Sequence, residues 1–254
     1  GCIGEDEHGL GLEQDLQRTV VDITHLVRRA DRQTPTYMKP LFTTTGEEQQ
    51  RFDIKNRIPT SADIEQDLVG RLESLADEAD GIIVLDQVQE PGCGVVTDRL
   101  RACVAEIAAK KPDLPILGDS RKRIDDYRNI IIKPNEDEAQ QATGTGTVGE
   151  AAEQLAKRNR RPVLLTRGPK GILVADGAWS STVPGIPVPP PIDIVGAGDS
   201  ASAAIVSALC AGATHANAAI LGVIASSITT QQLGTTGTAE PVQILDRFAE
   251  IYLS

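Results

Sequence analysis

The residues with the clearest chemical potential form a glycine-rich segment, Asp193–Asp199 (Asp-Ile-Val-Gly-Ala-Gly-Asp), which runs into small residues at 200–204. Gly196, Ala197 and Gly198 let the backbone approach a ligand closely. The helix expected after them presents unpaired N–H groups and the positive end of its dipole. The pattern therefore predicts a local binding site for an anion such as a phosphate.

Asp199 places a carboxylate at the edge of this site. A carboxylate there would repel a phosphate that was merely bound, but it could accept the proton of a hydroxyl that attacks the phosphate. The alternative is that Asp199 only caps the helix that follows the glycine-rich turn. The segment alone leaves both interpretations open.

A second polar segment, Lys133–Ala139 (Lys-Pro-Asn-Glu-Asp-Glu-Ala), follows a predicted strand. Asn135 and Glu138 are three residues apart, so they share a face of the first helical turn. Their oxygen atoms could order water around Mg²⁺, which prefers oxygen ligands and keeps several waters. The structural alternative is an acidic first turn that complements the helix dipole.

Two further segments fit either a nucleotide site or ordinary structure. Between two predicted strands, residues 166–171 form a hairpin turn or a nucleotide loop that offers Thr166, Arg167, Gly168 and Gly171. Small residues around Asn217 and at 225–227 form a flat wall for a planar base or a tightly packed helix interface.

Short apolar strands that alternate with helices would position these segments. The strands are expected at 81–86, 115–118, 129–133, 162–166 and 171–175. The helices are expected at 10–18, 61–79, 95–111, 136–142, 147–159, 199–211, 215–231 and 241–252. Strands that are apolar on both faces indicate an α/β fold with a mainly parallel sheet covered on both sides. Ligands of such sheets bind beyond the carboxyl ends of the strands.

Residues 34–56 alternate loosely at period two around Gly46, which predicts a small β-hairpin or flap. Lys39 and Arg51 of this flap could meet a substrate phosphate, although solvated surface charge is the simpler interpretation. The Gly-x-Gly-x-x-Gly match at 144–149 follows a helix rather than a strand, so it predicts a loop in which Thr147 caps the next helix.

Composition excludes several classes of protein. The chain has 254 residues, a net charge of −11 and 3% aromatic residues, which argues against partners such as nucleic acid or a membrane surface. Its four cysteines include no CxxC pair and its three histidines are far apart, so zinc and a disulfide framework are not expected. With no apolar run of membrane-spanning length and no secretory signal pattern, we expect a soluble, cytoplasmic protein.

In their order along the chain, these segments resemble the ribokinase-like (PfkB) family of carbohydrate kinases. The resemblance rests on KPNEDEA (133–139), TRGPKG (166–171), DIVGAGDSASA (193–203), NAA (217–219) and LGTTGT (233–238), and it covers essentially the whole chain. Within the family, the chain is most similar in look to the heptose-phosphate kinases, through residues 50–53, 118–121, 127–128, 134–135, 216–219 and 232–235.

The resemblance implies a ribokinase-like three-layer αβα sandwich with a small β lid at about 34–56. It also implies one kinase domain over 1–254 that is N-terminally incomplete, because Gly1–Gly9 is similar to a stretch that lies further along in the family. The implied activity transfers the γ-phosphate of ATP to a hydroxyl of a sugar or sugar phosphate, with Mg²⁺ as cofactor. The lid would also form a homodimer interface.

The implied roles follow the motifs residue by residue. Asp199 would be the catalytic base, and Gly196, Ala197 and Gly198 the anion hole. Asn135 and Glu138 would act on the nucleotide phosphates and Mg²⁺. Glu138 would contact Mg²⁺ through water. The nucleotide would be lined by Thr166, Arg167, Gly168 and Gly171, with Asn217 at the adenine side. Asp193 and the carbonyl of Val195 match positions that hold a monovalent cation such as K⁺ in some relatives.

The chain departs from the family pattern at several places, and the changes at Ile194 and Glu90, with the incomplete N-terminal part, motivate a rival hypothesis. Ile194 stands where the family usually has Thr, and Ala201 where a larger apolar residue is usual. Residues 86–92 lack the Asp-Tyr-x-Lys-Gly stretch of the heptose kinases. The rivals are a non-catalytic nucleotide- or sugar-binding degenerate kinase and a kinase of another small alcohol, such as a nucleoside or a vitamin. The low aromatic content disfavours a stacking pocket for such rings.

Overall fold

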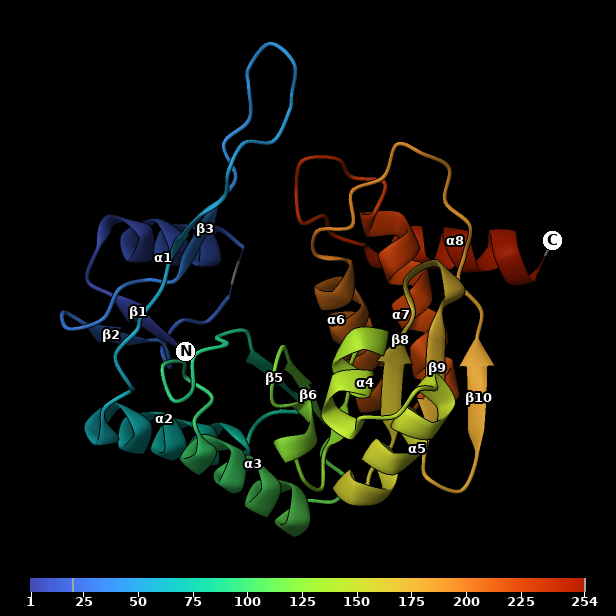
Figure 1. The fold of residues 1–254 in the computed structure, drawn as a ribbon, viewed down its shortest axis with the longest axis horizontal. Helices are drawn as coiled ribbons and strands as arrows, with labels where there is room; N and C mark the ends of the chain where they lie inside the picture. The colour runs from blue at the N-terminus through green and yellow to red at the C-terminus, as the bar shows by residue number, and fades with distance from the viewer. Residues whose placement is uncertain (20, 254) are drawn as a thin grey trace. The chain divides into compact units, whose positions relative to one another are not determined.

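The structure is a computed structural model that describes residues 1–19 and 21–253 (Figure 1). The chain divides into two compact units. The smaller contains Gly1–Leu75 and Val88–Leu100, and the larger contains Ala76–Gln87 and the chain from Arg101 onward.

The larger unit is built on a six-stranded sheet of order β10-β9-β8-β7-β6-β5. Its strands are β5 (Ile82–Asp86), β6 (Ile116–Ser120), β7 (Ile131–Ile132), β8 (Val163–Thr166), β9 (Ile172–Ala175) and β10 (Ser180–Val183). The four strands β5 to β8 run parallel, whereas β9 and β10 are antiparallel to their neighbours. The prediction of a mainly parallel sheet is confirmed, with an antiparallel end.

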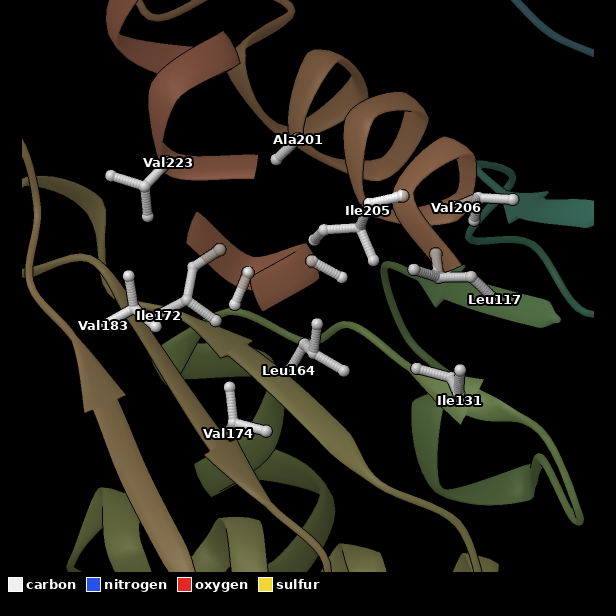
Figure 2. Packing of buried hydrophobic residues seen from close by; sticks show 13 residues of the cluster. Leu117, Ile131, Leu164, Ile172, Val174, Val183, Ala201, Ile205, Val206 and Val223 are labelled. Carbon is white, nitrogen blue, oxygen red and sulfur yellow. The ribbon is translucent and has the colours of Figure 1, made fainter. Parts of the chain in front are cut away.

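Helices cover both faces of this sheet (Figure 1). Helices α6 (Ala197–Cys210) and α7 (His215–Thr229) pack on one face, and α4 (Glu136–Thr143) and α5 (Val148–Asn159) pack on the other. Figure 2 shows apolar side chains of α6 and α7 facing those of the strands, among them Ile205 and Leu164, which are fully buried. The remaining helices are α3 (Asp98–Lys110) and α8 (Pro241–Tyr252). This is the expected three-layer αβα arrangement.

The smaller unit contains two short sheets. β1 (Cys2–Gly4) pairs in parallel with β2 (Val27–Arg29), and β3 (Thr36–Met38) pairs antiparallel with β4 (Phe52–Ile54). The β3–β4 pair is the expected hairpin, and its connection turns at Gly46 with a φ of 71°. The helices of this unit are α1 (Glu7–Arg18) and α2 (Ala62–Leu75).

Some boundaries differ from the sequence prediction for local reasons. Helix α3 begins at Asp98 rather than at residue 95, because the Thr97 hydroxyl accepts the N–H of Leu100 at its start. The Gly-x-Gly-x-x-Gly match is a loop, as predicted, and Thr147 caps α5 by accepting the N–H of Glu150. Among the described residues, no helix has the length and apolar character needed to span a bilayer.

Candidate active site

The glycine-rich segment forms the start of α6 (Ala197–Cys210). Gly196 is the N-cap residue and has a φ of +80°, and a Cβ on it would lie 2.5 Å from the carbonyl oxygen of Thr236. At the helix start, the N–H of Ala197 donates to Ile194 O (3.2 Å) and that of Ser200 to Gly196 O (2.9 Å).

The next two N–H groups of this helix, those of Gly198 and Asp199, have no hydrogen-bond acceptor within the described part of the chain. Together with the positive end of the helix dipole, they form a site for an anion. The geometry therefore fits the predicted anion hole.

Asp199 directly follows Gly198 in the first turn of α6. It is exposed, and its side chain makes no hydrogen bond or ion pair with any residue that the structure describes. Because Gly196 is the N-cap, Asp199 lies inside the first turn and does not cap the helix through its side chain. The capping interpretation is wrong, and the carboxylate is free to act on a bound ligand.

Lys133 supplies a cation that was not predicted. It follows β7, only 4% of it is exposed, and its Nζ lies 2.8 Å from Asp119 Oδ2. The same Nζ lies 3.7 Å from the point where a Cβ on Gly198 would stand. A buried ammonium therefore faces the anion site. The available signal in the sequence was a lysine at the end of an apolar strand, where burial calls for a partner.

Asn135 and Glu138 form a reciprocal capping box at the start of α4 (Glu136–Thr143). The Asn135 N–H donates to Glu138 Oε2 (2.9 Å), and the Glu138 N–H donates to Asn135 Oδ1 (2.8 Å). The helix thus starts with an acidic first turn, as the structural alternative stated, and with a capping box in addition. Glu138 Oε1 remains available on the side of Arg121, whose Nη1 is 3.7 Å away. Burial, and to a lesser extent the nearby Asp119 carboxylate, raises the pKa of Glu138.

The carboxylates of Asp119 and Glu138 beside an anion site fit a hard cation, because they would otherwise repel a polyphosphate. In residues 1–19 and 21–253, no three His, Cys, Asp or Glu side chains gather into a metal site of their own. Mg²⁺ is usually bound by one or two carboxylates together with substrate phosphates and water, and Asp119 and Glu138 could supply such carboxylates.

An apolar cavity of about 490 Å³ opens beside the anion site. It is lined by Thr166, Gly168, Pro169, Gly171, Ile172, Gly185, Ile186, Pro187, Val188, Ile192, Ile194, Ala197, Gly198, Ala201, Val223, Ser226, Ser227 and Thr230. Its volume and aliphatic walls fit a nucleobase and its ribose. The connector at 184–191, predicted only as an extended link, provides one wall.

The structure brings some of the predicted nucleotide residues to this cavity and leaves others outside. Thr166, Gly168 and Gly171 line it, and the Thr166 N–H donates to Pro134 O (2.8 Å), which joins the second and third motifs. Arg167 lies outside the lining and donates to Glu136 Oε1 (2.8 Å).

Asn217 also lies outside the lining, in the first turn of α7 (His215–Thr229), where its N–H donates to Thr214. The part of α7 that lines the cavity starts at Val223, six residues further on, a rise of about 9 Å along the helix. Asn217 thus lies outside this cavity lining, and its role at the adenine side stays a prediction.

The residues matched to a cation site join two loops. Asp193 Oδ1 accepts the N–H of Val195 (3.0 Å), and Asp193 Oδ2 accepts the N–H of Gly234 (3.1 Å). Both carboxylate oxygens of Asp193 thus tie the start of α6 to the loop at Gly234. Its predicted role in holding a monovalent cation stays a prediction.

The two flap cations belong to the smaller unit and pair with acids there. Lys39 Nζ lies 3.1 Å from Glu48 Oε1, and Arg51 Nε lies 2.7 Å from Asp53 Oδ1. Arg51 also lies over the ring of Tyr37. These contacts fit the solvated-surface interpretation, and they leave a role toward a substrate phosphate as a proposal.

Comparison with known proteins shows which proteins this chain is similar to. A bifunctional protein HldE of Hyphomonas neptunium is 30% identical over an alignment of length 258. The alignment covers 96% of this chain and 50% of that protein. A bifunctional protein HldE of Trichlorobacter lovleyi is 28% identical, with 96% and 50% covered. The chain thus spans about half the length of the curated relatives it matches.

Solved structures share the fold, and residues 1–242 match the description "pfkB family carbohydrate kinase". Phosphofructokinase-2 of Escherichia coli, in complex with potassium, gives a TM-score of 0.75 at 20% identity, covering 98% of this chain and 80% of that one. A ribokinase of Arabidopsis thaliana, complexed with ribose and ATP, gives 0.72 at 23% identity, covering 97% and 80%. The larger unit's αβα layers are thus ribokinase-like, and the chain belongs to the pfkB family of carbohydrate kinases.

Proposed function

We propose that the protein is an ATP-dependent kinase that transfers the γ-phosphoryl group to a hydroxyl of a sugar or sugar phosphate, with Asp199 as general base. The observation that carries this proposal is the unpartnered Asp199 carboxylate in the first turn of α6, next to the two free N–H groups of Gly198 and Asp199. A base and an anion site side by side suit phosphoryl transfer to an alcohol.

Each residue of the site has a distinct task in this reaction. Asp199 accepts the proton of the acceptor hydroxyl as the oxygen attacks phosphorus. The N–H groups of Gly198 and Asp199, with the buried Lys133 ammonium, hold the charge that spreads over the phosphoryl oxygens. The acceptor oxygen gains the phosphoryl group, and ADP leaves with the bridging oxygen.

The nucleotide is held by the apolar cavity and by Thr166, Gly168 and Gly171. Asn135 and Glu138 act at the phosphate end, where Mg²⁺, when bound, would neutralise charge on the phosphates. Asp193 and the Val195 carbonyl would hold K⁺ near the start of α6. Arg167 and Asn217 are left out of the nucleotide contacts, because they lie outside the cavity lining.

A sugar phosphate is the acceptor class that the similarity to heptose-phosphate kinases favours. Lys39 and Arg51 would then bind its phosphate from the β3–β4 hairpin, which would act as a lid and as the contact between two copies of the chain. In this proposal both units work as one kinase domain. Residues 86–92 differ from the corresponding stretch of the heptose kinases, so the acceptor sugar must be identified by experiment.

The test is ADP release from Mg-ATP across a panel of sugars, sugar phosphates, nucleosides and vitamins. Asp199→Asn should lower kcat by about 100- to 10,000-fold and leave ATP binding nearly intact. Asp246→Asn, another exposed helix aspartate, is the matched control and should keep full activity. Full activity of Asp199→Asn would exclude the assigned base, and binding of ATP without turnover on any acceptor would favour the degenerate kinase.

A further inference from the structure

Arg121 is a cation beside the candidate metal site for which the proposed reaction has no task so far. Its side chain is 52% exposed, and its Nη1 lies 3.7 Å from Glu138 Oε1. Its Nε donates to Gln87 Oε1 at 3.4 Å. These are long contacts to partly hydrated groups, so the guanidinium is loosely held in this structure.

The backbone on either side of Arg121 is, by contrast, tightly fixed. Its own N–H donates to Asp86 O (3.2 Å). The hydroxyl of Ser120 donates to Asp86 Oδ2 (2.8 Å) and accepts the N–H groups of Lys122 (3.4 Å) and Arg123 (3.0 Å). The turn after β6 is thereby tied to the end of β5.

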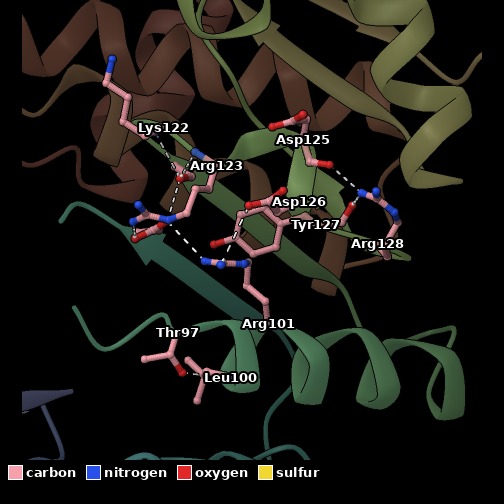
Figure 3. A network of polar contacts seen from close by, with 11 residues as sticks. Thr97, Leu100, Arg101, Lys122, Arg123, Asp125, Asp126, Tyr127 and Arg128 are labelled. Atoms are coloured by element: carbon pink, nitrogen blue, oxygen red, sulfur yellow. Dashed lines mark hydrogen bonds and ion pairs between the residues drawn. The ribbon is translucent and has the colours of Figure 1, made fainter. Parts of the chain in front are cut away.

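The anchor of this turn is a buried ion network (Figure 3). Asp86 is only 2% exposed, and its two carboxylate oxygens accept from Arg123 Nη2 (2.8 Å) and Arg123 Nε (3.0 Å). Arg101 Nη1 lies 3.8 Å from the same carboxylate. Figure 3 shows Arg101 and Arg123 converging beside Tyr127, while Lys122 extends away from them. A well-anchored turn therefore carries a weakly held cation.

A cavity of about 280 Å³ lies next to this cation. Its lining includes Arg121 and Lys122 from the turn and Glu138 from α4. Asp125 lines the cavity as well, so two cations and two carboxylates surround it. An anionic ligand that entered with a cation beside Glu138 would meet Arg121 and Lys122 there.

We propose that Arg121 is a phosphate-binding residue that contacts the outer phosphates of the nucleotide. In the nucleotide-free protein, Glu138 holds it weakly. If Glu138 helps to hold Mg²⁺, the guanidinium of Arg121 would give up that contact and would pair with phosphate oxygens through its planar fork. Arg121 and Lys133 would then flank Glu138 and Asp119, so that each carboxylate has a cation beside it. This inference rests on the proposed kinase function.

The test compares Arg121→Ala and Arg121→Lys with the parent protein in calorimetric binding of Mg-ATP and of AMP. Arg121→Ala should weaken Mg-ATP binding by about 10- to 100-fold, because a hydrogen-bonded charge is lost. AMP binding should stay within about twofold, because AMP lacks the outer phosphates. Lysine should give an intermediate loss, because it keeps the charge but not the fork.

Arg158→Ala is the matched control. Its side chain is 40% exposed and pairs with Asp125 at 3.0 Å on the same turn, so it removes a similar cation from outside the site. This variant should bind Mg-ATP like the parent. Equal Mg-ATP affinity for Arg121→Ala and the parent, or an equal loss toward AMP, would overturn the inference. A parent protein that binds Mg-ATP but turns over no acceptor would instead overturn the proposed function.

A purely structural role as the partner of Glu138 makes a different prediction. In that case the effect of Arg121→Ala should vanish in a Glu138→Gln background, because the pair is already broken. Direct phosphate binding predicts that a loss of at least about fivefold in Mg-ATP affinity persists in that background. Disappearance of the loss would overturn direct contact.

Discussion

Lys133 and Asp119 form a buried ion pair at the carboxyl ends of the neighbouring parallel strands β7 and β6, with 2.8 Å between Nζ and Oδ2. The side chain of Lys133 is 4% exposed and that of Asp119 is 15% exposed. Because the Nζ also faces Gly198, the pair holds a cation in place at the anion site before any ligand arrives. Such preorganised charge contributes strongly to the stabilisation of a transition state.

Lys133→Met should lower both activity and stability. We expect a fall in kcat of at least about 100-fold, because the ammonium no longer stabilises the moving phosphoryl group. We also expect a loss of about 3 kcal/mol in the free energy of unfolding, because Asp119 stays half-buried without its partner. Steady-state kinetics and urea unfolding measure the two effects. The double variant Lys133→Met/Asp119→Asn should recover much of the stability and none of the activity, and recovery of both would rule out a catalytic role.

Gly196→Ala should damage the site more than an equivalent change elsewhere. An alanine at a φ of +80° is strained by about 1–2 kcal/mol, and its Cβ would also meet Thr236 O at 2.5 Å. Either Gly196 or residue 236 must move, which displaces the start of α6. Turnover should fall by at least about tenfold, a loss of about 1.4 kcal/mol in transition-state stabilisation.

The matched control for this change is Gly144→Ala. Gly144 ends α4 with a φ of +71°, but a Cβ there would meet no atom within 4 Å. It should lose similar backbone stability in thermal unfolding while keeping its turnover. Equal turnover in the two variants would mean that the turn at Gly196 does not position the site.

Much of the larger unit could be predicted from the sequence because its elements carry strong local patterns. The continuous apolar run at Ile82–Asp86 and the small-residue run after Gly198 are such cases. β10 (Ser180–Val183) was missed because three of its four residues are exposed and polar. β1 and β2, with three residues each, are too short to show a period.

The site was predictable only where one contiguous segment forms it. Asp199 and its glycines are local, and so is the Asn135–Glu138 box. The role of Lys133 depends on its proximity to Gly198, which lies 65 positions away in the sequence and next to it in space. The cavity wall formed by the connector at 184–191 and the absence of Asn217 from that cavity depend on how whole elements pack. Local sequence does not contain that information.

Glu138→Gln should change how stability depends on pH. Burial raises the pKa of Glu138, so the folded protein binds this proton more tightly than the unfolded chain does. The ionised carboxylate therefore destabilises the fold, an effect that is absent below the unfolded pKa, about 4.3, and complete above the raised one. Glutamine preserves the capping box without the charge.

The melting temperature of the nucleotide-free parent, relative to Glu138→Gln, should fall as the pH rises through that window. Thermal melts of both proteins between about pH 4 and pH 7.5 measure the difference. Asp137→Asn removes another acid in the first turn of α4 and is the control. The difference in melting temperature between the parent and this variant should not change in the same way with pH. A difference that stays constant or moves the other way would contradict the burial of an ionised Glu138.

Tyr127→Phe should stabilise the protein. Tyr127 is 1% exposed, and its ring packs 3.3 Å from the point where a Cβ on Gly118 would stand. Among the described residues, its hydroxyl finds no hydrogen-bond partner. Burial also raises the pKa of this phenol, so it stays neutral. Removing a buried, unsatisfied hydroxyl should add about 1 kcal/mol to the free energy of unfolding.

Urea unfolding of Tyr127→Phe should show a higher midpoint at an unchanged m value. Tyr37→Phe, at a tyrosine that is exposed, should leave the midpoint where it is. A lower midpoint for Tyr127→Phe would mean that the hydroxyl binds a buried water beside the Asp86 network, because the protein is destabilised only when a hydrogen-bonded hydroxyl is removed. The direction of the shift therefore shows whether a water molecule is bound in this network.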